Sequence, residues 1–194
     1  MHISTFTPRL GVIVALIWAA GCQPRQGVSR RPESLAPAIS NEFVSEQYGV
    51  KLSIPRGWSP RPSDDFVLEL SPATDALGGA SAQAPTISLD VPKLPPHLPG
   101  MIRMGLIENG LLDDLRKQFR DVRLLGRDDQ EIPGTQTRAI KIAWQAGSEE
   151  FLQHARLMIH GGRVYIVRAT ALVAQFERTS KAYDEVIQSL VWTR

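Results

Sequence analysis

Two adjacent glycines, Gly161 and Gly162, constrain the fold of this chain more than any other feature. They separate two segments, 151–160 and 163–171, in which apolar and polar residues alternate. Such alternation is typical of a strand with one buried face, and a tight turn between two strands needs the positive φ angles that glycine adopts freely. The pattern therefore predicts a β-hairpin and a mostly antiparallel sheet.

Five further alternating segments predict strands, and two segments with a helical period predict helices. The strands are expected at 50–54, 66–70, 86–91, 122–127 and 136–144, and the helices at 101–119 and 174–190. The order β-β-β-α-β-β-β-β-α predicts an α+β fold, an antiparallel sheet flanked by two helices. A body of about 150 residues buries enough surface to fold without a metal or a disulfide.

The N-terminus carries an unbroken apolar run of eleven residues, Leu10–Ala20, preceded by Arg9. A helix of that length spans about 16 Å, whereas the hydrocarbon core of a bilayer is about 30 Å thick. The run is too short to cross a membrane but suits the apolar core of a secretory signal, so residues 1–21 are interpreted as a signal peptide. The alternative is a buried core helix, which the position at the chain end argues against.

The run ends in Trp18-Ala-Ala-Gly-Cys22, and Cys22 is the only cysteine of the chain. This segment resembles the lipobox of bacterial lipoproteins, although that family prefers leucine where this chain has Ala19. The resemblance implies cleavage between Gly21 and Cys22, and acyl chains on Cys22 that anchor the protein in a membrane. In a cell with two membranes, Gln23 after the cysteine implies the outer membrane, with the body in the periplasm. An ordinary secreted protein is the alternative.

Residues 22–42 are rich in proline, serine, glutamine and arginine and show no apolar period. Such a segment cannot bury enough surface to offset its chain entropy, so it is interpreted as a flexible linker after the lipidated cysteine. Its arginines are expected to contact anionic lipid headgroups. The alternative is a linker that is simply a soluble spacer. The folded domain is then residues 43–194.

The run Tyr48-Gly-Val-Lys-Leu-Ser-Ile-Pro-Arg-Gly-Trp58 resembles the opening of PsbP-like domains. The glycine hairpin that leads into 164–167, then Phe176 and a helix closing at Leu190, is similar to their ending. The resemblance covers residues 43–193 and implies an α/β/α sandwich around an antiparallel sheet. Its members include the extrinsic PsbP subunit of photosystem II and many bacterial envelope lipoproteins. The matching positions are turn and core residues, so no functional residue is carried over.

Motifs for catalysis, cofactor binding or metal binding are missing from the sequence, with no dinucleotide, P-loop, zincin or cysteine-pair signature. Residues 79–83 approach a nucleophile elbow but lack its last glycine. His154 and His160 fall on the same face of one predicted strand, about 20 Å apart, which is too far to share a metal. His97 lies in a proline-rich loop, which we expect to be remote from both. We therefore expect no enzyme, no metal and no cofactor.

Three residues are candidates for a binding surface: Trp58 beside Pro60 and Pro62, and Arg116 and Arg120 in a basic run that begins on the first helix. The alternative for Trp58 is a tryptophan packed in the core. The alternative for Arg116 and Arg120 is a solvated charged face, since aspartates interleave with the arginines. The net charge of the chain is only +2, which argues against nucleic acid as the partner.

The sequence thus predicts a lipid-anchored cell-envelope protein that acts as a non-enzymatic binding or support module for another envelope component, with a protein partner. A carrier of a small apolar ligand between sheet and helix is the alternative. A hydrolase with an unrecognised site is the third hypothesis.

Overall fold

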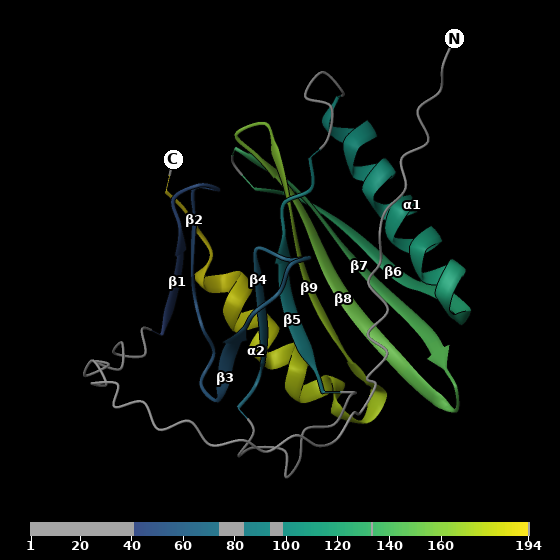
Figure 1. Cartoon of the computed structure of the whole chain (residues 1–194). Coiled ribbons are helices and arrows are strands. Elements are labelled where there is room, and N and C mark those ends of the chain that lie inside the picture. The colour runs from purple at the N-terminus through teal and green to yellow at the C-terminus, as the bar shows by residue number, and fades with distance from the viewer. Residues whose placement is uncertain (1–40, 74–83, 94–98, 133, 194) are drawn as a thin grey trace, which may run out of the picture. The chain divides into compact units, whose positions relative to one another are not determined.

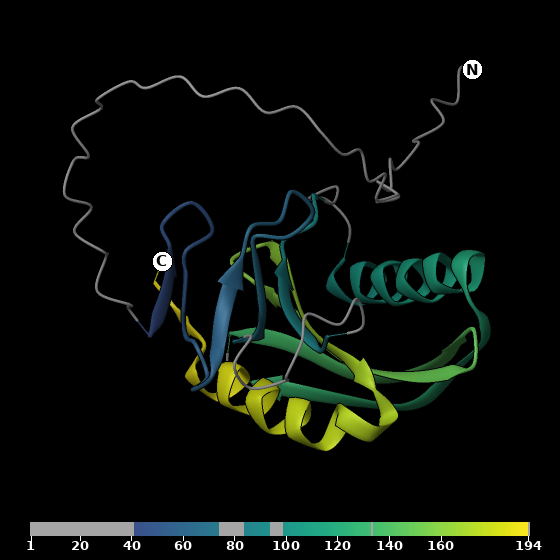
Figure 2. The same ribbon diagram turned by 60° about the horizontal axis from the view of Figure 1, so that its bottom comes forward.

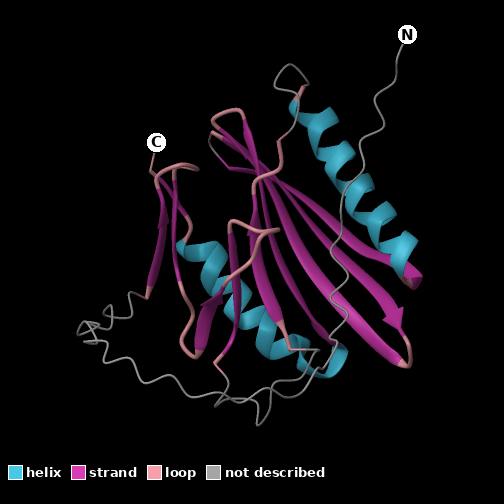
Figure 3. Cartoon of the chain, in the orientation of Figure 1, coloured by secondary structure: helices cyan, strands magenta, loops and turns pink. Residues whose placement is uncertain are grey.

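The structure, a computed structural model, describes residues 41–73, 84–93, 99–132 and 134–193. Within them lie two α-helices, a short 3₁₀ turn (Val173–Gln175) and ten strands (Figure 1, Figure 3). The helices are α1 (Gly100–Gln118) and α2 (Phe176–Ser189). The strands are β1 (Glu42–Ser45), β2 (Val50–Ser53), β3 (Trp58–Arg61), β4 (Leu68–Pro72), β5 (Thr86–Asp90), β6 (Arg120–Ile132), β7 (Thr135–Ala146), β8 (Glu149–His160), β9 (Arg163–Leu172) and β10 (Val191–Trp192).

Seven strands form the main sheet in the order β3-β4-β5-β9-β8-β7-β6, and β1, β2 and β10 form a second, small sheet. Every pair of neighbouring strands is antiparallel. The predicted hairpin is confirmed as β8–β9, with Gly161 at φ 55° and Gly162 at φ 77° in its turn. Glycine is needed at both positions because a Cβ disfavours this left-handed conformation.

The two helices cover opposite faces of the main sheet, as Figure 2 shows. Alternate residues of β9 illustrate the arrangement: Val164 and Ile166 pack with α1 residues, whereas Tyr165 and Val167 belong to the cluster that contains α2 residues. Each buried aliphatic side chain contributes about 1.5–3 kcal/mol, so both apolar faces of the strand require a helix over them. The α+β prediction, a sheet flanked by two helices, is confirmed.

The small sheet extends the core on the α2 side. Its buried residues Val50 and Leu52 pack in the same cluster as Tyr183 and Val186 of α2, and Trp192 packs against that cluster. Strands β1 and β10 were not predicted, since segments of four and two residues are too short to show a period. Strand β3 was not predicted either, and its Pro60 is tolerated because β3 is an edge strand.

Strand β6 is longer than expected, since it runs from Arg120 to Ile132 whereas the alternation predicted only 122–127. Its second half is highly charged, and two register irregularities interrupt its pairing with β7. Backbone hydrogen bonds to β7 extend this edge strand where no apolar pattern marks it.

Candidate functional site

The turn of the β8–β9 hairpin meets the turn between β1 and β2. The Arg163 guanidinium donates a hydrogen bond from Nη1 to the Gln47 carbonyl oxygen at 2.7 Å. The Tyr165 hydroxyl donates to the Tyr48 carbonyl oxygen, also at 2.7 Å. The Thr193 amide donates to the Gly49 carbonyl oxygen at 3.0 Å, which ties the same turn to the end of β10. Three segments distant in the sequence are thereby held together, and we call this region the hairpin end.

Two open hollows lie at the hairpin end and share Tyr48 and Arg163. The first, of about 400 Å³, is lined by these two residues together with Val91, Pro92 and Lys93, among others. The second, of about 250 Å³, lies next to Tyr165 and His160. Because Arg163 and Tyr48 line both, the two hollows adjoin each other at these residues.

The second hollow has an aromatic wall formed by His160 and Tyr165, and Trp192, which does not itself line the hollow, packs against both rings. The His160 ring stacks on Trp192 with ring centroids 4.4 Å apart and planes 4° apart, and Trp192 tilts against Tyr165 at 4.6 Å. The other side of the imidazole is held as well, since its Nδ1 lies 3.2 Å from the Gly134 carbonyl oxygen and 3.0 Å from Thr135 Oγ1. The wall is therefore fixed before any ligand arrives.

The charge at the hairpin end is positive. Lys93 and Arg163 are both exposed, and neither has an ion-pair partner within the described part of the chain. No aspartate or glutamate is found among the described residues that line either hollow. The site combines aromatic and aliphatic surface with two unneutralised cations, which is the composition of a binding site for an anionic group with an apolar part.

The three residues proposed from the sequence lie elsewhere. Trp58 is half-buried on β3 and packs against the α2-side core, while Arg120 begins β6. These strands are the two opposite edges of the main sheet, so the fold does not bring Trp58 and Arg120 together. Arg116 pairs with Asp113 on the exposed face of α1, at 3.4 Å.

Arg120 itself lines a third hollow, of about 480 Å³, beside Asp121 and the β7–β8 turn at Gly147. Twelve residues of β8 separate this turn from the hairpin end. At about 3.3 Å per residue, the two sites are some 36 Å apart along that strand. Residues of the hairpin end were missed by sequence reasoning, although Tyr48 and the Gly161–Gly162 turn had been recognised as fold signals.

His154 is engaged with the core. Its ring contacts Phe176 edge-on with centroids 5.4 Å apart and lies 5.7 Å from the Tyr183 ring. Burial, with the nearby Lys141 as the next cause, lowers the pKa of His154 to about 4. The ring is therefore neutral at pH 7. Burial also raises the pKa of the Tyr183 phenol beside it.

Among the described residues, no group of three or more histidine, cysteine, aspartate or glutamate side chains is arranged to hold a metal ion. None of the helices in this described part is both long and apolar enough to cross a membrane. Gly21, Cys22, His97 and the segment 79–83 lie outside the described residues.

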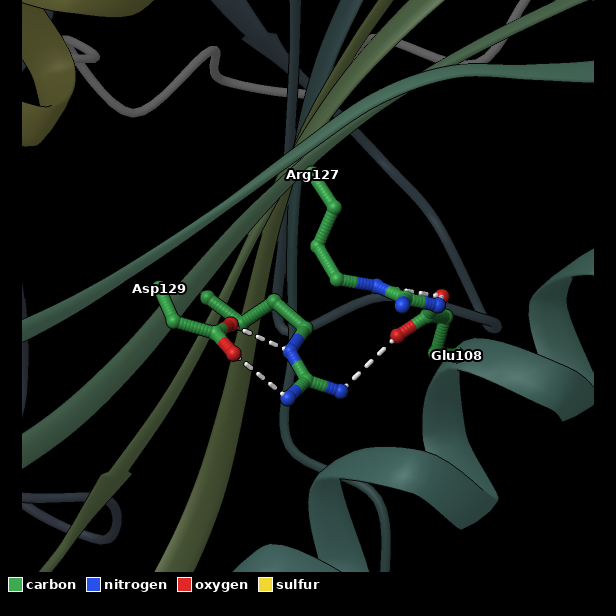
Figure 4. A network of polar contacts seen from close by, with 4 residues as sticks. Glu108, Arg127 and Asp129 are labelled. Atoms are coloured by element: carbon green, nitrogen blue, oxygen red, sulfur yellow. Dashed lines mark hydrogen bonds and ion pairs between the residues drawn. The ribbon is translucent and has the colours of Figure 1, made fainter.

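A network of charges joins α1 to the edge of the main sheet (Figure 4). Glu108 of α1 is only 1% exposed, and it accepts hydrogen bonds from Arg127 of β6 and, at 2.9 Å, from Arg138 of β7. Arg138 also donates to Asp129 at 2.8 Å, and this hydrogen bond lowers the pKa of Asp129. Each carboxylate faces a guanidinium, which is the arrangement of a structural pin rather than of a reactive centre.

A second ion pair lies on β5 and β9, where Arg168 donates to Asp90 at 3.0 Å and lies over the Phe66 ring at 5.0 Å. Burial raises the pKa of Asp90 despite this partner. Burial likewise lowers the pKa of Arg168. Desolvation thus offsets much of the attraction between the two charges.

No protein-family model matches the sequence, and no curated protein matches it. Solved structures do resemble it. The solution structure of cyanobacterial PsbP from Synechocystis sp. PCC 6803 is 11% identical with a TM-score of 0.59, covering 81% of this chain and 95% of that one.

Two further proteins are similar in structure. LpqN of Mycobacterium tuberculosis, described as involved in cell envelope biogenesis, is 14% identical with a TM-score of 0.56, over 75% of this chain and 83% of that one. The Ran-binding protein Mog1p of Saccharomyces cerevisiae is 9% identical with a TM-score of 0.55, over 78% of this chain and 94% of that one. At these identities the likeness concerns the fold, and the described domain has the PsbP-like α+β fold.

Proposed function

We propose that this protein is a lipid-anchored cell-envelope protein whose PsbP-like domain acts as a non-enzymatic binding module for another envelope protein. The observation that carries the proposal is the pair of hollows at the hairpin end, where hydrogen bonds from Arg163 and Tyr165 join the two turns. Both hollows open onto the surface and combine aromatic with basic residues, as protein-binding surfaces do. This favours a protein segment over an enclosed apolar ligand.

The comparisons support a binding role without specifying it. Mog1p is described as a Ran-binding protein and LpqN as a protein of cell envelope biogenesis. The fold is thus found in a protein-binding protein and in a protein of the cell envelope, which supports a binding role in the envelope for this chain.

The anchor is the second part of the proposal. Residues 1–21 act as a signal peptide, cleavage falls between Gly21 and Cys22, and the acylated Cys22 begins the mature chain. Residues 22–42 form the linker, and 43–194 form the domain. Several acyl chains on one residue, at about 0.8 kcal/mol per buried methylene, make a lasting anchor. With Gln23 after the cysteine, the protein resides in the outer membrane and faces the periplasm where the cell has two membranes.

Two measurements test these parts separately. Intact-mass analysis of the membrane fraction is expected to find a mature chain that begins at Cys22 and carries acyl chains, and Cys22→Ser is expected to release the protein from membranes. An unacylated chain, or a Cys22→Ser variant that sediments with lipid as before, would overturn the anchor.

The binding role is tested by photo-crosslinking in intact cells, with the reactive residue placed at Gln47 or, as a control, at Gln145 near the opposite turn. We expect a discrete crosslinked partner from Gln47 and not from Gln145. The absence of crosslinks from Gln47 in cells that retain the anchored protein would count against the hairpin end as the binding surface.

A further inference from the structure

Building on the proposed binding function, we propose that the hairpin end binds an extended acidic segment of the partner protein. Lys93 and Arg163 pair with carboxylates of that segment, and the half-buried Tyr48, Val91 and Pro92 contact its apolar side chains. Acidic residues spaced by apolar ones are the chemistry this site recognises.

The residues that line the two hollows indicate that the ligand is negatively charged. Lys93 and Arg163 have no ion-pair partner in the part of the chain that the structure describes. Glu46, which precedes the lining residue Gln47 in the sequence, is exposed in the β1–β2 turn and lines neither hollow. The Arg163 bond to Gln47 engages one of the five N–H donors of the guanidinium, which leaves others for a carboxylate.

The size of the site favours a chain over a small anion. The first hollow alone has a volume of about 400 Å³. A water molecule accounts for about 30 Å³, so a phosphate, which is only a few times larger, would leave most of that hollow wet. The second hollow shares Arg163 and Tyr48 with the first, so a ligand that fills both hollows has to extend past these two residues. An extended peptide, which advances about 3.3 Å per residue, can do so.

The apolar lining supplies the second half of the recognition. Val91 and Pro92 line the first hollow, and Tyr165 with the stacked His160–Trp192 pair lies at the second. Tyrosine, tryptophan and arginine are the residues that carry most binding energy at protein interfaces. Since hydrogen bonds and stacking already hold these groups, little conformational entropy is lost when a ligand binds.

The test uses a fluorescein-labelled nonapeptide of alternating aspartate and leucine or tyrosine, followed by fluorescence anisotropy at 50 mM NaCl. The protein carries Cys22→Ser in every arm, so that no acyl chain contributes. We expect saturable binding of the peptide. Its affinity should fall at least tenfold with Lys93→Gln and at least tenfold with Arg163→Gln. The affinity of the unsubstituted site should also fall when NaCl is raised to 300 mM. Arg120→Gln, near the opposite end of β8, is the matched control and should leave the affinity unchanged.

Folding is controlled in two ways. Lys93 has no hydrogen bond or ion pair to another described residue in the structure, so Lys93→Gln should keep the melting temperature. Arg163→Lys keeps the positive charge and should restore part of the affinity that Arg163→Gln loses. A loss of binding that tracks a fall in melting temperature across the variants would overturn the proposal.

Three other outcomes would overturn it as well. The same peptide with asparagine in place of aspartate could bind equally, which would remove the role of the charges. Inorganic phosphate at millimolar concentration could displace the peptide fully, which would indicate a simple anion site. Vesicles of phosphatidylglycerol could bind with the same dependence on Lys93 and Arg163, which would indicate a lipid surface instead. None of these results affects the acylation of Cys22 or crosslinking from Gln47, so the broader function is judged separately.

Discussion

Protonation of His154 should destabilise the folded protein in mildly acidic solution. The ring is half-buried against Phe176 and Tyr183, and its Nδ1 has no hydrogen-bond partner among the described residues. Lys141, its cross-strand partner, and Arg156 disfavour a charge on the ring, while Asp184 of α2 partly compensates. These contacts lower the pKa of His154 from 6.5 to about 4.

The sign of the effect follows from this lowered pKa. The unfolded chain takes up the proton near pH 6.5, whereas the folded chain resists it until the pH is about 4. The contribution to stability is therefore fully present above pH 6.5 and is lost as the pH falls toward 4. A shift of this size corresponds to about 3 kcal/mol at most, and the partial exposure of the ring reduces it to about 1–2 kcal/mol.

Urea unfolding of the wild-type protein and of His154→Phe at pH 7.5 and pH 4.5 measures this contribution. Phenylalanine keeps an aromatic ring beside Phe176 but cannot be protonated. Between the two pH values the wild type should lose about 1–2 kcal/mol more unfolding free energy than the variant, because all other titrating groups are shared and cancel in the difference. An equal loss in both proteins would refute the assignment.

Three further changes test the packing of the domain. Glu108→Gln should lower the unfolding free energy by about 2–4 kcal/mol in urea denaturation, since it removes the buried negative charge that faces Arg127 and Arg138, whereas Arg116→Gln on the exposed face should change it by less than about 0.5 kcal/mol. Asp90→Ala alone should cost about 3 kcal/mol, but Asp90→Asn combined with Arg168→Met should come within about 1 kcal/mol of wild type by the same measurement, because desolvation offsets the pair. Gly162→Ala should cost about 1–2 kcal/mol in thermal unfolding, since alanine disfavours positive φ, and an unchanged melting temperature would contradict the role given to that turn.

The elements that the sequence predicted are those with a long, regular pattern. The strands of the β8–β9 hairpin are twelve and ten residues long and flank a glycine turn, and α2 carries a clear apolar stripe, so both were found within a few residues of their bounds. The short strands β1, β3 and β10 were missed because they are held by their neighbours rather than by a pattern of their own. The second half of β6 was missed for the same reason, since pairing with β7 extends it through charged residues.

The candidate site was harder to predict from the sequence than the fold. Arg163 and Gln47 are 116 residues apart in the chain, and neither stands out by type or spacing. A basic residue after a glycine turn and a tyrosine before a strand are common, so their meeting could not be inferred. The residues singled out instead, Trp58 and Arg120, were chosen for their chemical character, and the strand order places them on opposite edges of the main sheet.

Local chemistry by itself determined the alternation of faces, the position of the hairpin turn at Gly161–Gly162 and the class of the fold, because these depend on neighbouring residues and on the period of the backbone. The tertiary structure decided which turns meet. Pairing of β2 with β10 and packing of the small sheet on the α2-side core bring Tyr48 beside Tyr165 and Arg163. That proximity is a property of strand order and of a shared core, which no single segment encodes.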